Sequence, residues 1–286
     1  MNHSFKVIVI GSKGFLGQSI VQDLRAYGIK STALSRSEID LNIPSSVLKL
    51  RELITPESIL VFAAAKAPAR TEDVLLENIQ MVSNLLKVIS DLEFSYLLNV
   101  SSDAVYPDLS GKIDEGVQIA PTSIHGSMHA EREKMLNALK VPVGHLRPTL
   151  VYGASDPHGG YGPNQFVKSA MSGLPIKLFG EGEELRDHID IRDVGKIARA
   201  MITNKQTGPI NAVSGEVHSF REIAEVISHK VQNTKIVFLK RSGPVPHNGY
   251  RAFKLAKVQD LVPSFKAITI QRGLENMINE LRAKNG

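Results

Sequence analysis

The start of the chain carries the feature that most constrains its fold. The apolar run KVIVI at 6–10 leads directly into Gly11-Ser12-Lys13-Gly14-Phe15-Leu16-Gly17, and apolar residues then recur at helical spacing over 15–27. Glycines alone mean little, because turns use glycine everywhere. A strand that turns through three glycines into a helix allows a tight turn, close approach of the backbone to phosphates, and close helix packing. This segment therefore predicts a dinucleotide-binding loop, with the pyrophosphate at the helix N-terminus.

Short apolar runs alternate with helical patterns through the first half of the chain. We expect strands at 5–10, 31–35, 58–65, 95–102 and 141–148, and helices at 15–27, 45–53, 71–92 and 122–139. Such alternation implies parallel strands joined by right-handed crossovers. The predicted fold class is therefore α/β, a Rossmann-like doubly wound parallel sheet that binds ligands at the carboxyl ends of its strands.

The pattern changes after Tyr152. A segment rich in glycine and proline at 153–164 precedes shorter elements, expected at 176–179, 187–191, 193–203, 219–231, 235–239 and 269–283. We expect residues 1–152 to form the dinucleotide-binding domain. Residues 153–286 are expected to form mainly a small C-terminal substrate lobe, with elements near 187–213 returning to the main domain.

Composition excludes several classes of site and partner. The 286 residues include no cysteine, so disulfides, thiolate metal sites and cysteine nucleophiles are excluded. The net charge of +5 is spread along the chain, which disfavours nucleic-acid binding. No apolar run reaches the about 18 residues of a spanning helix, and the N-terminus enters a core strand without a signal segment. We therefore expect a cytoplasmic protein without a membrane partner.

The end of the second predicted strand should contact the adenosine ribose of the dinucleotide. A carboxylate there favours NAD, but the stretch Leu34-Ser35-Arg36 contains none. Arg36, with Ser35 and Lys13, could bind a 2′-phosphate, so the sequence favours NADP over NAD, the alternative being a solvated surface arginine. Further residues are expected to line the cofactor cleft: Asp40 and Leu41 near the adenine, and Ala63, Ala64 and Ala65 after the third strand.

Several longer segments carry a family resemblance. They are GSKGFLG, VFAAA, NVSSDAVYPD, LRPTLVYGASDPHGGYGPNQF and FGEGEELRDHIDIRDVGKIARA, in this order. With them the chain resembles the extended short-chain dehydrogenase/reductase family, and in particular its nucleotide-sugar epimerases, dehydratases and reductases. The resemblance implies NAD(P)-dependent hydride transfer to or from a sugar carbon. It also implies a nucleotide-sugar substrate and a homodimer formed through helices 71–92 and 122–139.

The resemblance assigns a catalytic hydroxyl at the end of the fourth strand. In the family a serine or threonine there hydrogen-bonds the reacting sugar oxygen, and the match to SSDAVY assigns this role to Ser102. Dehydratases of the family follow it with an Asp-Glu pair, whereas this chain has Asp103 and Ala104. Dehydration is therefore disfavoured, although Asp103 could still donate a proton.

The family's catalytic tyrosine and lysine correspond to two histidines here. The segment PTSIHGSMHAERE puts His125 at the tyrosine position and His129 at the lysine position, on one helix face. In the favoured interpretation His125 exchanges the proton and His129 binds the nicotinamide ribose. The alternatives are a catalytically impaired cofactor-binding or sensor protein, a structural partner in a larger assembly, or a metal-binding pair that lacks a third ligand.

The family resemblance also suggests contacts to the substrate and to the active-site backbone. Arg186 corresponds to a position that contacts the substrate diphosphate, the alternative being an ion pair with Glu183 or Glu184. Asn164, after the glycine-rich loop, is expected at the sugar or its nucleotide, and Arg251 is a second candidate diphosphate contact. Asn78, on the long helix, is expected to support the active-site backbone. No metal is predicted.

Overall fold

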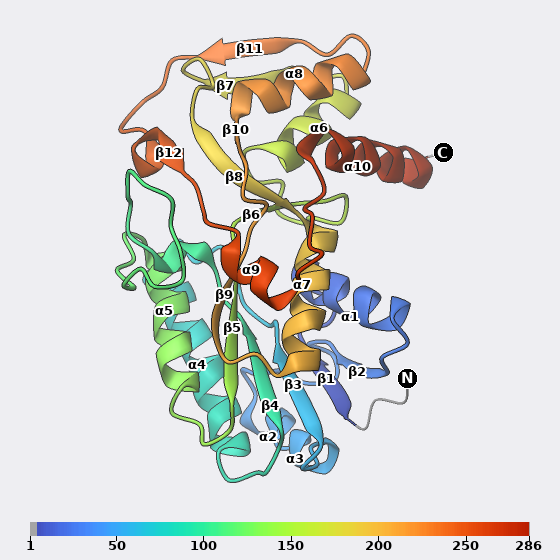
Figure 1. The fold of residues 1–286 in the computed structure, drawn as a ribbon, viewed down its shortest axis with the longest axis vertical. Helices are drawn as coiled ribbons and strands as arrows, with labels where there is room; N and C mark the ends of the chain where they lie inside the picture. Colours follow the sequence, from blue (N-terminus) through green and yellow to red (C-terminus); the bar gives the residue numbers. More distant parts are fainter. Residues whose placement is uncertain (1–4, 286) are drawn as a thin grey trace.

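A six-stranded parallel sheet forms the centre of the larger part of the molecule in the computed structural model, which describes residues 5–285 (Figure 1). The strand order is β2-β1-β3-β4-β5-β9, and every neighbouring pair is parallel. The strands are β1 (Lys6–Ile10), β2 (Ser31–Leu34), β3 (Ser58–Phe62), β4 (Tyr96–Val100), β5 (Val143–Pro148) and β9 (Gly208–Ala212). The chain moves outward from β1 in both directions, so the carboxyl ends of β1 and β3 border a crevice.

Helices cover both faces of this sheet (Figure 1). One face carries α1 (Phe15–Ala26) and α7 (Ile191–Asn204), which pack on Val7 and Val9 of β1. The other face carries α4 (Glu72–Ile89) and α5 (Ile124–Leu136), which pack with Ile8 and Ile10 of the same strand. Successive strand residues point to opposite faces, so both faces must be apolar to be covered in this way. The predicted doubly wound α/β fold is confirmed.

The smaller part of the molecule lies beyond the carboxyl ends of the main strands (Figure 1). Its strands are β6 (Leu150–Tyr152), β7 (Ile176–Phe179), β8 (Leu185–Asp190), β10 (Val217–Ser219), β11 (Ile236–Leu239) and β12 (Tyr250–Arg251). Its helices are α6 (Pro163–Met171), α8 (Phe220–Lys230) and α10 (Ile270–Asn285), with a short 3-10 turn, η2 (Pro246–Gly249). The three helices share a separate apolar core that includes Phe166, Phe220 and Leu274.

The chain crosses between the two parts more than once. Strand β9 pairs with β5 in the main sheet, and α7 packs against α1, whereas β8 pairs with β10 and β12 in the smaller part. The short helix α9 (Ala256–Leu261) packs on β9.

The structure differs from the sequence-based prediction at several elements. The single helix expected at 45–53 is two short turns, α2 (Pro44–Val47) and α3 (Leu50–Leu53). Helix α6 was not predicted; it begins at Pro163, inside the segment taken for a loop. Within residues 5–285, none of the helices combines the length and the hydropathy that crossing a membrane requires.

Candidate functional site

The loop between β1 and α1 has the backbone that its glycines were expected to provide. Gly11 has a φ of +88°, and a Cβ atom there would lie 2.5 Å from the backbone nitrogen of Ala64. A Cβ at Gly17 would lie 2.2 Å from the Gly11 carbonyl oxygen. Helix α1 begins after Gly14 without a side-chain cap or an acidic residue in its first turn. Its first N–H groups are thus free to bind an anion such as a pyrophosphate.

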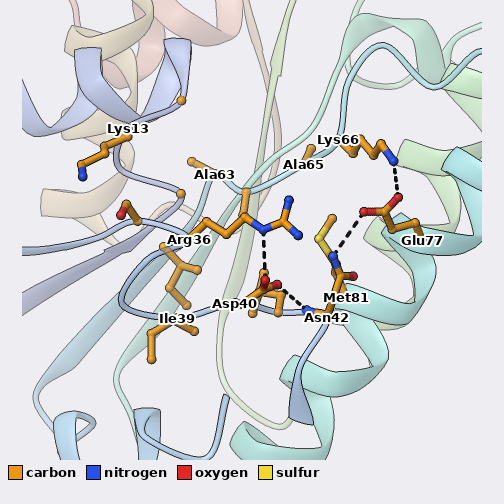
Figure 2. Close-up of a pocket in the computed structure, with 16 residues that line it drawn as sticks. Lys13, Arg36, Ile39, Asp40, Asn42, Ala63, Ala65, Lys66, Glu77 and Met81 are labelled. Atoms are coloured by element: carbon orange, nitrogen blue, oxygen red, sulfur yellow. Dashed lines mark hydrogen bonds and ion pairs between the residues drawn. The ribbon is translucent and has the colours of Figure 1, made fainter. Parts of the chain in front are cut away.

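A cavity of about 320 Å³ lies beside this loop (Figure 2). It is bounded by the ends of β1 and β2, the segment after β3, and one face of α4. Ten residues predicted at the cofactor line it: Gly11, Lys13, Gly14, Ser35, Arg36, Asp40, Leu41, Ala63, Ala64 and Ala65. Of the other predicted cofactor residues, Leu16 packs against the apolar core, and Phe15, Gly17, Asn78 and His129 do not line the cavity.

Hydrogen bonds join polar side chains along one wall of the cavity (Figure 2). Arg36 Nε donates to Asp40 Oδ2 at 3.0 Å, and the backbone N–H of Asn42 donates to Asp40 Oδ1 at 3.0 Å. The Asn42 side chain donates to Glu77, which also forms an ion pair with Lys66. Sequence reasoning missed Asn42, Glu77 and Lys66, because polar residues on a helix or loop carry no signal of what they face.

A carboxylate does reach the end of β2, which corrects the sequence-based view of this position. Glu38, three residues beyond Ser35, turns back and accepts hydrogen bonds from the Ser35 backbone N–H at 2.8 Å and from the Ser35 hydroxyl. These bonds, the one from the hydroxyl first, lower the pKa of Glu38 to about 2. The donors of Ser35 are therefore already paired with a negative charge.

Asn78 holds the segment that follows β3. It is buried on α4, where its Oδ1 accepts from the Lys66 backbone N–H and its Nδ2 donates to the Lys66 carbonyl, both at 3.0 Å. The Nδ2 group also donates to the Val74 carbonyl at 2.7 Å. Asn78 thereby fixes the backbone next to Ala63–Ala65, the wall of the cavity.

Ser102 and Asp103 follow β4 at the same edge of the sheet. Ser102 caps the 3-10 turn η1 (Asp103–Val105), and its Oγ accepts the Ala104 backbone N–H at 3.1 Å. The Ser102 hydroxyl itself donates to Asp103 Oδ1 over a long 3.4 Å. Asp103 pairs with Arg251, whose Nε lies 2.7 Å from Asp103 Oδ2.

The two histidines stand at the start of α5 with their rings in contact. The ring centroids of His125 and His129 are 4.7 Å apart, in an edge-to-face arrangement. His125 is half-buried and its Nδ1 accepts the Ala69 backbone N–H at 3.3 Å, whereas His129 is buried and its Nδ1 has no partner. Burial lowers the pKa of both imidazoles, that of His129 well below its usual value.

Gly126 allows helix α5 to approach the 3-10 turn η1, which follows Ser102. A Cβ atom at Gly126 would lie 2.1 Å from the Ala104 carbonyl oxygen, so only glycine allows this contact. A buried ion pair fixes the other end of the helix: Glu133 contacts Arg147 on β5 through two hydrogen bonds and accepts from Ser101 at 2.6 Å. His125 is thus held beside η1 by backbone contact and buried charge.

The predicted substrate residues lie in the smaller part, and their polar groups are largely occupied. Arg186 on β8 and Arg251 on β12 are register partners. Arg186 pairs with Glu184 and donates to the Pro246 carbonyl, while Arg251 contacts Asp103 and the Pro107 carbonyl. The Asn164 amide bonds the backbone of 151–153 on both sides. Among the described residues, no group of three histidine, aspartate or glutamate side chains is placed to bind a metal.

Comparisons relate the chain to known proteins. The sequence model of the NAD dependent epimerase/dehydratase family matches residues 7–214. The chain is 23% identical over 209 residues to an uncharacterized UDP-glucose epimerase of Bacillus subtilis (strain 168), covering 70% of this chain and 65% of that protein. It is 23% identical over 314 residues to a dTDP-4-dehydro-6-deoxy-D-allose reductase of a Streptomyces species, covering 94% of each.

Solved structures share the fold. A UDP-glucose 4-epimerase from Thermus thermophilus, in complex with NAD, matches with a TM-score of 0.83 at 22% identity, over 97% of this chain and 99% of that one. A UDP-glucuronic acid 4-epimerase from Bacillus cereus, in complex with UDP-glucuronic acid and NAD, matches with a TM-score of 0.81 at 19% identity, over 98% of this chain and 100% of that one.

Proposed function

The chain belongs to the NAD dependent epimerase/dehydratase family, and from this premise we propose that it is an oxidoreductase or epimerase acting on a nucleotide-linked sugar. The observation that supports this most is the convergence of three segments at one edge of the sheet. The β1–α1 loop offers free N–H groups, Ser102 follows β4, and His125 opens α5 against η1. When bound, a nicotinamide cofactor supplies hydride transfer to or from the sugar carbon.

Ser102 would orient the reacting sugar oxygen. Its Oγ accepts a backbone N–H and donates to Asp103 Oδ1 at 3.4 Å, a long contact that a sugar oxygen placed beside η1 would replace. A donor fixed in this way stabilises negative charge as it develops on that oxygen. Asp103 lies next to it: its Oδ1 accepts from Ser102, and its Oδ2 accepts from Arg251 of the smaller part of the molecule.

His125 would hydrogen-bond the same oxygen, at the position to which the family resemblance assigns proton exchange. It is half-exposed, it lies beside η1, and its Nδ1 is occupied by the Ala69 N–H, so its Nε2 is the atom available to a sugar. His129, behind it, would face the ribose next to the nicotinamide. The impaired-sensor and structural-partner alternatives are not favoured, because the family and the related proteins are enzymes of this type.

The choice between NAD and NADP is the finer question about the cofactor. The prediction of NADP rests on Ser35 and Arg36, but each is paired with a carboxylate in the structure, Glu38 and Asp40 respectively. A 2′-phosphate would meet both negative charges, so this arrangement supports NAD. Use of NADP stays a prediction.

Two related structures suggest the substrate class. The Bacillus cereus protein is in complex with UDP-glucuronic acid and NAD, and another protein of the same fold, MoeE5, is in complex with UDP-glucose and NAD. We infer a sugar attached to a uridine or thymidine diphosphate. The predicted homodimer and cytoplasmic location stay predictions.

Turnover by the purified protein tests the proposal. UDP-glucose, UDP-glucuronate and a dTDP-4-keto sugar would be incubated with each cofactor, and the products identified by mass spectrometry. Replacing Ser102 with alanine should lower turnover by about 100-fold while cofactor binding persists, and Ser102→Thr should retain most activity. Failure of the purified protein to bind either cofactor, measured by fluorescence, would exclude the proposed function.

A further inference from the structure

A positive charge without a carboxylate partner lies buried one helical turn beyond the histidine pair. The Arg132 side chain has no exposed surface. Its Nη2 donates to the Ala64 carbonyl at 2.9 Å, and its Nη1 contacts Asn78 Oδ1 at 3.4 Å. The guanidinium carbon lies 4.6 Å from the centroid of the Phe62 ring. No ion pair is formed by Arg132 within residues 5–285, and its Nε is buried without a hydrogen-bond partner.

Such a charge is costly to bury, because neutral carbonyl and amide oxygens replace only part of its hydration. Arg147, on the same side of the sheet, shows the usual solution: it is paired with Glu133. A packing role could be filled by methionine or leucine at no electrostatic cost. Arg132 lies beneath Ala64, in the wall of the cavity, and on the same helix as the two histidines. This position points to an electrostatic role.

Every charged group that faces His125 can be named. Among the described residues, Asp103 from η1 is the acidic group whose charge acts on it, and Arg251 is paired with that carboxylate. His129 and Arg132 face it from its own helix, and from the segment after β3 the Ala69 N–H occupies its Nδ1. A backbone N–H can only donate, so Nδ1 is an acceptor and the ring proton of the neutral imidazole lies on Nε2.

We propose that Arg132 is a positioning residue that keeps His125 neutral with its proton on Nε2, so that His125 presents a hydrogen-bond donor to the sugar oxygen at neutral pH. The Ala69 N–H fixes the tautomer, and the buried guanidinium, about two turns further along the same helix, disfavours a second positive charge at His125. The neutral imidazole N–H then stabilises negative charge on the sugar oxygen by hydrogen bonding, while the proton of that oxygen passes to Ser102 as the Ser102 hydroxyl gives its own proton to Asp103 Oδ1. The catalytic part of this inference rests on the proposed function; the charge state does not.

The pKa directions agree with this geometry. Burial lowers the pKa of His125 most, Asp103 raises it, and Arg132 lowers it. For His129, burial again comes first and the charge of Arg132 second. Arg132 thus acts on both rings in the same direction.

A titration of the histidine rings tests the charge state without any turnover. In protein with ¹⁵N-labelled histidine, nitrogen NMR shifts separate the two neutral tautomers from the protonated ring, and His125→Gln identifies the signal. We expect wild-type His125 to be the Nε2–H tautomer, with a midpoint below its ordinary value. In Arg132→Met the midpoint should rise by about 1 pH unit, whereas Arg132→Lys should stay near the wild type.

Stability and activity separate this role from a structural one. Because Arg132→Met removes an uncompensated buried charge, the unfolding midpoint of this variant should equal or exceed that of the wild type. Its turnover should fall, and the acid limb of its pH–rate profile should move to higher pH. A lower unfolding midpoint with an unchanged His125 titration would overturn the proposal. If Arg132→Met does not fold, the wild-type spectrum decides: a ring protonated on Nδ1, or still charged at pH 7, would overturn it as well.

These outcomes also separate the inference from the function it rests on. If no nucleotide sugar is turned over but His125 titrates as expected in wild type and Arg132→Met, the proposed function fails and the charge assignment stands. If turnover occurs and the titration does not depend on Arg132, the function stands and the role of Arg132 fails.

Discussion

At the residue scale, the cofactor groove is defined by which donors are already occupied. Ser35 offers a backbone N–H and a hydroxyl where the ribose is expected, and Glu38 takes both. The hydrogen bonds from Ser35 lower the pKa of Glu38 to about 2, so a negative charge stands beside the Ser35 donors at neutral pH. Glu38, which lies beyond the end of β2, therefore sets the local charge at a position where the residues of β2 carry none.

Replacing Glu38 with glutamine should shift the cofactor preference toward NADP. The variant keeps the hydrogen bonds of Ser35 but removes the charge, so the ratio of kcat/KM for NADPH to that for NADH should rise by about tenfold. Exposed Glu52→Gln is the matched control and should leave the ratio unchanged. An equal ratio in Glu38→Gln and wild type would show that Glu38 does not face the ribose.

A second residue-scale prediction concerns His188, which is buried on β8 with an unpartnered Nε2. Burial lowers its pKa to about 3. Because folding lowers this pKa, the native state keeps its full stability at pH values above the ordinary histidine pKa. It loses that stability as pH falls from about 6.5 toward 3. Between pH 7.5 and 5.5, His188→Leu should lose about 1 kcal/mol less free energy of unfolding than wild type, as urea titration would measure.

The exposed His229→Leu variant is the control for this experiment and should follow the wild type at both pH values. Asp187 opposes the trend, because burial raises its pKa to about 6 and its carboxylate destabilises the fold above that pH. Equal pH dependence in His188→Leu and wild type would mean that His188 is not responsible for the acid sensitivity.

At the element scale, helix α5 is the part that must be placed most accurately. Its first turn carries His125, and Glu133, near its end, is fixed to Arg147 on β5. Both side chains of this pair are almost fully buried. The helix that carries the proposed catalytic histidine is thus attached to the central sheet by a buried charge pair and not by apolar packing alone.

Removing one partner of this pair should be much worse than removing both. Arg147→Met leaves the Glu133 carboxylate buried and unpaired, and should lower the free energy of unfolding by about 3–5 kcal/mol. The double variant Glu133→Met/Arg147→Met should cost clearly less than the sum of the single changes. Urea unfolding of the wild type, the two single variants and the double variant measures the coupling energy between Glu133 and Arg147. Additive costs of the two single changes would contradict this prediction.

The same elements show how far the sequence alone leads. Strand–helix alternation predicts β1 to β5 and helices α1, α4 and α5, because each buries an apolar face whose spacing is visible in the sequence. It does not predict α6, whose start lies among glycines and prolines. Short strands such as β10 and β12 exist only through pairing with β8, which local patterns cannot reveal.

The candidate site divides in the same way. The glycines and alanines that line the cavity could be predicted, because their small size after a strand is itself the signal. Glu38, Lys66 and Glu77 could not, since a charged residue reads as solvated surface until its partner is known. No sequence pattern singles out Arg132, and only its complete burial in the structure distinguishes it.

At the scale of the whole molecule, the two parts meet at the candidate active site. Strand β12 of the smaller part lies next to η1 of the larger part, and Arg251 joins them. Its nitrogens contact Asp103, the Pro107 carbonyl and Asp108, and only 4% of its side chain is exposed. The residue predicted to bind a substrate diphosphate therefore already binds the other half of the protein.

Arg251→Met decides between these two roles. If Arg251 mainly joins the two parts, the variant should lose about 2–3 kcal/mol of stability, below the usual range for a buried pair because Asp103 keeps 16% exposure. Its kcat should fall more than its affinity for UDP, since Asp103 and Ser102 share the released turn. If Arg251 mainly binds phosphate, UDP affinity measured by calorimetry should collapse at an unchanged unfolding midpoint. Arg186→Met is the matched comparison: its partner Glu184 lies on the same side of the boundary, so its loss should leave the turn around Asp103 in place.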